Sequence, residues 1–167
     1  MDMLIRPEAK EDESAIGALT RDAFRGAPHS DQTEAEIIAA LREAGALTVS
    51  LVATEHDTIV AHVAFSPVTV NGTHQGWYGL GPVSVTPARQ GNGIGQVLIN
   101  DGLARLKQLG ARGCVVLGDP AYYDRFGFKP NEHLTYPNVP RAYFQALSFE
   151  DSIPNGIVAY HAGFATR

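Results

Sequence analysis

Hydrophobic and polar residues follow two different periods along the chain. Before Gly45, apolar side chains recur every three or four positions, which predicts two amphipathic helices, Glu11–Phe24 and a second from Thr33 through Leu41. The short apolar run Met3–Arg6 predicts a strand that ends at Pro7. From Leu47 the period changes to two, which predicts three consecutive strands, Leu47–Glu55, Thr58–Val70 and Thr73–Val85.

Turn and cap residues join these segments. Asn71-Gly72 is typical of a two-residue hairpin, so the second and third of these strands are expected to pair antiparallel. Thr33 has the spacing of a capping box, and Gly45 is placed to end the second helix. Pro82 lies inside the third strand, where it cannot donate to a ladder. It predicts a bulge or a splayed strand with free backbone groups.

The second half of the chain predicts a strand–helix–strand unit. An amphipathic helix over 93–109 connects the third strand to the apolar run Cys114–Leu117, which is typical of a buried parallel strand. Asp119 and Pro120 then begin a short helix as N-cap and first helical residue.

Two final strands complete the predicted α/β fold, a mixed sheet with helices. They cover Tyr143–Ser148 and Gly156–Tyr160, and the proline- and asparagine-rich stretch Lys129–Arg141 before them predicts a surface loop.

Three glycines, Gly91, Gly93 and Gly95, lie where the third strand passes into the following helix. Glycine lets the backbone come close to a ligand, and a helix N-terminus offers unpaired N–H groups at the positive end of its dipole. The pattern therefore predicts a phosphate site. Gln96 and Val97 replace the Lys-Ser/Thr of a nucleotide P-loop, which excludes that class.

A dinucleotide-binding fingerprint matches less well. Gln96 stands where the third glycine of that fingerprint is required. Asp119 follows the next strand, where the partner of a ribose would lie. An NAD(P)-dependent oxidoreductase therefore stays as an alternative.

Composition restricts the class of protein. With 44% hydrophobic and 19% charged residues, the chain fits one soluble domain, residues 1–167. The net charge of −5 argues against a nucleic-acid backbone as partner. The apolar runs are too short to span a membrane, no residue cluster has metal-ligand spacing, and the single cysteine, Cys114, is expected to be a buried structural thiol. A cytoplasmic protein without a metal is predicted.

Two motifs resemble the GNAT superfamily of N-acetyltransferases. Gln90-x-x-Gly93-x-Gly95, three residues after Pro87, resembles the loop that holds the acyl-CoA pyrophosphate. Tyr123-Asp-Arg-Phe-Gly-Phe128 is similar to the segment that ends the acyl-CoA site in these enzymes, and the run from Leu117 onward resembles the YhbS-like branch. The resemblance covers essentially the whole chain. It implies a central splayed, mostly antiparallel sheet flanked by helices.

The resemblance also implies roles for particular residues. The backbone of Val83 and Val85 would bond the acetyl carbonyl and the pantetheine amides. Tyr123 would protonate the departing thiolate, a role that suits a phenol because its usual pKa of about 10 lies above that of a thiol. The N–H groups that would hold the pyrophosphate belong to Gln90, Gly91, Asn92, Gly93, Ile94 and Gly95.

The general base stays open. Many members of the superfamily carry a carboxylate on the strand before the glycine loop, but 75–83 contains none. Asp119 is one candidate, although its N-cap position explains it without catalysis. The others are His74, Glu34, Glu36, a water chain or a backbone carbonyl.

Three further side chains have two interpretations each. Trp77 and Tyr78 could line an acceptor pocket or pack in the sheet, and packing is favoured for both. Arg89 could meet a further cofactor phosphate or stay solvated in its loop.

The sequence as a whole predicts an N-acetyltransferase. Acetyl-CoA would donate its acetyl group to a primary amine of a small molecule or a protein, by direct attack in a ternary complex. A catalytically silent acyl-CoA-binding regulatory module is the second alternative. The oligomeric state stays open, with a homodimer as one state to test.

Overall fold

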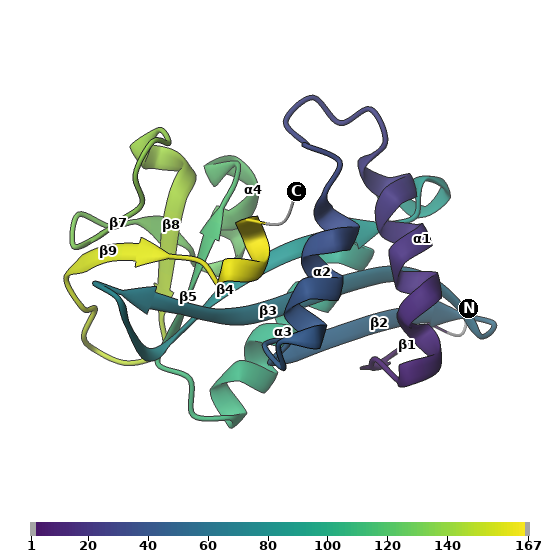
Figure 1. Ribbon diagram of the computed structural model, residues 1–167, viewed down its shortest axis with the longest axis horizontal. Helices are drawn as coiled ribbons and strands as arrows, with labels where there is room; N and C mark the ends of the chain where they lie inside the picture. Colours follow the sequence, from purple (N-terminus) through teal and green to yellow (C-terminus); the bar gives the residue numbers. More distant parts are fainter. Residues whose placement is uncertain (1–2, 166–167) are drawn as a thin grey trace.

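A nine-stranded mixed sheet forms the centre of the computed structural model, which describes residues 3–165 (Figure 1). Its main path runs β1-β2-β3-β4-β5-β8-β6, and β9 joins β3 and carries β7. The strands are β1 (Met3–Pro7), β2 (Val49–Glu55), β3 (Thr58–Val70), β4 (Thr73–Val85), β5 (Gly113–Leu117), β6 (Lys129–Pro130), β7 (Leu134–Thr135), β8 (Phe144–Ser148) and β9 (Gly156–Ala159).

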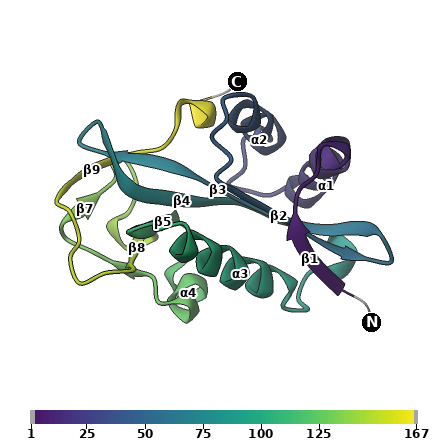
Figure 2. The same cartoon turned by 90° about the horizontal axis from the view of Figure 1, so that it is seen from below.

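Helices cover both faces of this sheet. Figure 2 shows α1 and α2 on one face and α3 and α4 on the other. The helices are α1 (Glu13–Phe24), α2 (Glu34–Glu43), α3 (Ile94–Gln108) and α4 (Pro120–Tyr123). The largest apolar core lies between α3 and the sheet, where the ring of Phe65 lies against Gly102. A Cβ at Gly102 would meet that ring at 2.1 Å, so glycine allows the helix its close approach to β3.

The predicted meander and the predicted parallel connection are both confirmed. Strands β1 to β4 pair antiparallel in succession, and Asn71 and Gly72 turn the β3–β4 hairpin with φ of 50° and 82°. Strand β5 pairs parallel with β4 across α3. Cys114 is a buried free thiol, as predicted.

Two local predictions are wrong. Thr33 precedes α2 at the N-cap position, but its side chain makes no capping hydrogen bond. The Glu36 carboxylate, which would complete the capping box, faces Arg21 of α1 at 3.7 Å. The Ser30 hydroxyl lies within 2.8 Å of both carboxylate oxygens of Glu34. The stretch predicted as the surface loop Lys129–Arg141 contains β6 and β7, and Leu134 in β7 is buried in the second apolar core.

A bulge at Pro82 interrupts the regular pairing of β4 with β3, as the position of this proline predicted. Val63 pairs with Val83 and Phe65 with Leu80, so Ala64 alone lies opposite two residues of β4. On its other edge β4 pairs with β5 through only three residues, 77–79. Beyond Gly79 the two strands separate.

A buried polar network ties the first strand to α2, β2 and β3. Arg42 donates from Nε and Nη2 to the carboxylate of Glu8, at 2.8 and 3.0 Å. The Ser50 hydroxyl also donates to Glu8, and His62 Nε2 lies 2.8 Å from that hydroxyl oxygen. Because the Ser50 proton goes to Glu8, His62 carries its proton on Nε2. The pKa of His62 is lowered to about 4, chiefly by burial; the charge of Glu8 opposes this shift and that of Arg42 adds to it.

We predict that His62 makes the free energy of unfolding fall as the solution is acidified. The unfolded histidine takes up a proton below its ordinary pKa of 6.5, while the native one resists until about 4. Between pH 7 and 5 this linkage lowers stability by about 2 kcal/mol. Urea denaturation across that range measures it. We expect a smaller slope in His62→Gln, while His29→Gln, at an exposed site, keeps the wild-type slope. An unchanged slope in His62→Gln would contradict this assignment.

Candidate functional site

The open edge of β4 presents backbone groups that the sheet does not use. The N–H of Thr86 donates to the carbonyl of Val60 on β3, at 2.8 Å. Residues alternate along an antiparallel ladder, so Ser84 also faces β3, while the N–H and C=O of Val83 and Val85 point away from it. The side chain of Gln90 donates to the Val85 carbonyl at 3.0 Å. The splayed strand therefore offers donors and acceptors to a ligand between β4 and β5.

The glycine loop continues from this edge. Gly91 and Gly93 adopt φ of 83° and 80°, and Gly93 is the N-cap of α3. In the described part of the chain, no backbone carbonyl accepts a hydrogen bond from the N–H groups of residues 91–96. Free N–H groups at the start of a fifteen-residue helix fit an anion.

Helix α4 brings two tyrosines to the same side of the sheet, next to α3 (Figure 2). The Tyr122 hydroxyl lies 3.6 Å from the position that a Cβ of Gly95 would take. The half-buried ring of Tyr123 lies against Gly118 and the apolar core that Val83 and Val85 also contact. Burial raises the pKa of Tyr123 to about 12. This phenol is therefore protonated at neutral pH and able to donate a proton.

The other predicted polar residues have structural partners. Asp119 is exposed and accepts a hydrogen bond from Ala121 N at 2.9 Å, which confirms its N-cap role. Arg89 donates to the buried carboxylate of Glu55 at 2.6 Å, next to the β2–β3 turn. His74 Nδ1 lies 3.1 Å from the carbonyl oxygen of Val68, close to the β3–β4 turn.

A cavity of about 320 Å³ borders the bulge of β4. Leu80, Gly81 and Pro82 form one wall, and Glu34 of α2 and Phe24 of α1 form another. Glu36 does not line this cavity; its carboxylate faces Arg21 of α1 at 3.7 Å.

Three cavity residues come from the C-terminal segment, and sequence reasoning missed them. They are Tyr136, Tyr160 and Phe164, and the remaining lining residues are Ile37 and Leu117. The three C-terminal residues follow no periodic pattern and lie far from Glu34 in the sequence, so no local signal identifies them. Trp77 is fully buried in the core over Gly113, which confirms the packing interpretation. Tyr78 lines a different cavity together with His74.

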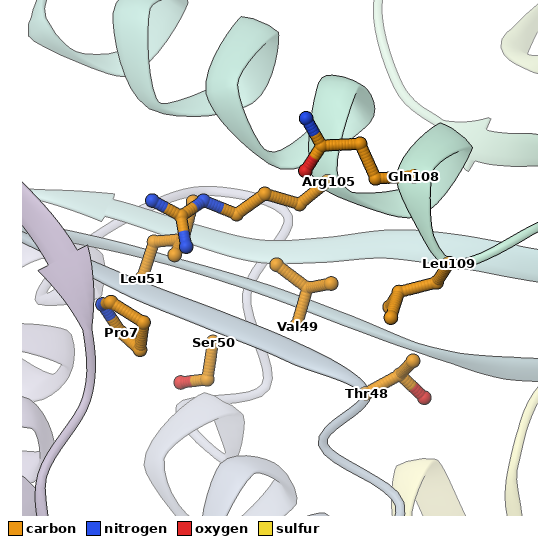
Figure 3. A pocket seen from close by; sticks show the side chains of 8 residues that line it. All are labelled: Pro7, Thr48, Val49, Ser50, Leu51, Arg105, Gln108 and Leu109. Atoms are coloured by element: carbon orange, nitrogen blue, oxygen red, sulfur yellow. The ribbon is translucent and has the colours of Figure 1, made fainter.

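A further cavity of about 250 Å³ lies between β2 and the C-terminal half of α3 (Figure 3). Its one charged lining residue, Arg105, pairs with Asp101 at 2.6 Å, and none of the predicted site residues borders it. Within residues 3–165 we find no cluster of three histidine, cysteine or acidic side chains that could hold a metal ion. No helix in that range has the length and apolar character needed to cross a membrane.

Comparison with known proteins gives a family match over most of the chain. The sequence profile of the Acetyltransferase (GNAT) family matches residues 13–128. The N-acetyltransferase YhbS of Escherichia coli strain K12 is 38% identical, over 97% of this chain and 98% of its own length.

Two crystal structures resemble the fold at full length. A GNAT family acetyltransferase from Brucella melitensis, in complex with acetyl-CoA, is 54% identical with a TM-score of 0.89, and the match covers 98% of each chain. YhbS from Escherichia coli, in complex with CoA, is 36% identical with a TM-score of 0.89, over 98% of this chain and 92% of its own.

We predict that the Asp119 carboxylate stabilises the protein through its cap. Replacement by alanine leaves the Ala121 N–H without its acceptor and lowers the free energy of unfolding by about 1 kcal/mol. Asp119→Asn is the matched control, because asparagine caps a helix as well as aspartate does. Urea denaturation at pH 7 compares the two. Equal stability of Asp119→Ala and Asp119→Asn would contradict the cap assignment.

Proposed function

Since the chain belongs to the Acetyltransferase (GNAT) family, we propose that it transfers the acetyl group of acetyl-CoA to a primary amine. The observation that carries this proposal is the separation of β4 from β5, which leaves the backbone of Val83 and the N–H of Val85 without a partner in the sheet, next to the glycine loop. The bound acetyl-CoA and CoA of the two similar crystal structures support the same choice of co-substrate.

The cofactor would lie along this opening. Pyrophosphate oxygens accept hydrogen bonds from the N–H groups of residues 91–95, at the positive end of α3. The side chain of Gln90 donates to the Val85 carbonyl, and its backbone N–H donates to the Pro87 carbonyl at 3.4 Å. Gln90 would therefore have to give up that long hydrogen bond to bind a phosphate oxygen. Further along β4, the N–H of Val83 points into the opening and would polarise the thioester carbonyl.

The reaction proceeds by direct attack in a ternary complex. The amine first gives up a proton, because an ammonium ion has no lone pair. Its nitrogen then bonds to the thioester carbon. The resulting oxyanion accepts a hydrogen bond from the N–H of Val83 in β4. The carbon–sulfur bond breaks, the thiolate takes the proton of Tyr123, and the nitrogen loses its second proton to restore that phenol. Amide, CoA thiol and one proton to solvent are the products.

A carboxylate is the natural acceptor for the first proton. Asp119 is the first candidate from the sequence, but its carboxylate accepts the Ala121 N–H and lies outside the cavity at the bulge. Glu34 lines that cavity together with Leu80 and Gly81. We therefore assign the role of general base, which takes the first proton of the amine, to Glu34. Asp119 has a structural role.

The proposal treats residues 1–167 as one catalytic domain. Its compartment is the cytoplasm, where a buried free thiol such as Cys114 stays reduced. The comparisons give no support to a silent acyl-CoA-binding module or to an NAD(P)-dependent oxidoreductase. A screen of amines for release of free CoA thiol separates the transferase from the first, and titration with NAD(P) tests the second.

We predict that CoA binds at the glycine loop and that Gly93→Ala weakens it about tenfold. The φ of 80° at Gly93 strains any other residue by about 1–2 kcal/mol and tilts the N–H groups that follow. Gly45→Ala is the matched control: its φ is 70°, open space surrounds it, and it ends α2. Calorimetric titration measures both. Wild-type protein that fails to bind CoA at high micromolar concentration contradicts the proposed function.

We predict that Tyr123→Phe lowers kcat by about 100-fold, the usual size of a general-acid effect. Because the phenol acts on the leaving thiolate, CoA affinity stays within about threefold of wild type. Tyr122→Phe removes the neighbouring hydroxyl, at the loop end of the site, and its kcat stays within about threefold. Thiol-release kinetics and calorimetry give the two readouts. Equal loss of kcat in both variants, or none in Tyr123→Phe, would refute the assignment.

A further inference from the structure

The cavity at the β4 bulge has a single charged group. Of the described residues that line it, Glu34 alone carries a charge. Within residues 3–165 no lysine, arginine or histidine side chain pairs with it. Its hydrogen-bond donor is the Ser30 hydroxyl, which has one proton for a carboxylate with about four acceptor positions. This half-buried carboxylate therefore has room for a cation.

Aromatic rings form much of the remaining wall. Tyr136 and Tyr160 have ring centroids 5.3 Å apart, and Phe164 lies 5.1 Å from Tyr160. Phe24 faces the same cavity from α1. Such a wall buries an apolar body and attracts a cation to the faces of its rings.

Tyr160 adds a polar group to the wall between this cavity and the one that His74 and Tyr78 line. Its hydroxyl is buried and has no hydrogen-bond partner among the described residues. Burial raises the pKa of this phenol, so it stays protonated. A buried hydroxyl without a partner is able to donate to a ligand or water from outside the chain, and Ser66 and Ser84 carry such hydroxyls as well.

We infer that the acceptor is a primary amine with one positive charge on an apolar body, and without a carboxylate. This inference rests on the proposed acetyl transfer. Glu34 binds the ammonium group and takes its proton, and the aromatic wall holds the body. Amino acids are disfavoured, because no described cation lines the cavity to pair with their carboxylate. Diamines are disfavoured, because no second carboxylate lines the cavity to pair with their second charge.

A panel of four amines tests the acceptor class by thiol release with acetyl-CoA. We expect kcat/KM for 2-phenylethylamine to be about 100-fold higher than kcat/KM for phenylalanine. It should also be at least tenfold higher than kcat/KM for putrescine and for Nα-acetyllysine methylamide. A higher or equal value for any of these three overturns the inference and leaves the acetyl transfer standing. CoA binding without turnover of any amine overturns both.

Binding to the CoA complex tests Glu34 without the chemical step. 2-Phenylethylamine and its neutral analogue 2-phenylethanol are titrated by calorimetry. We expect Glu34→Gln to weaken the binding of the amine about 30-fold, and to leave the affinity for the alcohol within threefold of wild type. Glu36→Gln, two residues along the same helix and outside the cavity, is the control and leaves both unchanged. CoA affinity confirms that each variant is folded. Unchanged amine binding in Glu34→Gln overturns the assignment.

Discussion

The separation of β4 from β5 is the constraint on which the rest of the structure depends. The two strands pair through only three residues, and the bulge at Gly81 and Pro82 then turns β4 away from a regular ladder. An unpaired strand edge inside a protein normally carries a cost, because buried N–H and C=O groups need partners. Here that edge leads directly into the free N–H groups of the glycine loop. Both features fit the proposed ligand, because a phosphorylated pantetheine has several acceptors and donors along its length.

The parts of the site that lie close together in sequence could be predicted from it. The glycine loop combines strand end, turn and helix start within a few residues, so its geometry follows from φ preference and the helix dipole. Pro82 predicted the bulge because proline has no N–H to give to a ladder. The capping box at Thr33 failed for a reason outside its own four residues, since the Glu36 carboxylate that would complete it faces Arg21 of α1 at 3.7 Å. Local sequence rules do not weigh a helix cap against an ion pair with another helix.

The cavity at the bulge could not be predicted, because it is assembled from distant segments. Phe24 and Glu34 flank the loop between α1 and α2, while Tyr136, Tyr160 and Phe164 come from the last part of the chain. Only the folding of β9 onto β3 brings that part next to β4. Arg89 illustrates the opposite error. Its position in the loop left a phosphate partner and a solvated side chain both open, but Glu55 of β2 holds its guanidinium instead.

The central claim, that the open edge of β4 and the loop after it hold acetyl-CoA, is tested most directly by amide hydrogen exchange. Exchange is measured by NMR or mass spectrometry with and without saturating CoA. The account predicts slower exchange at Val83, Val85 and the amides of residues 91–96, with little change in β1 or α1. Protection confined to other segments, such as the cavity beside Arg105, or no protection in CoA-saturated protein, would contradict it.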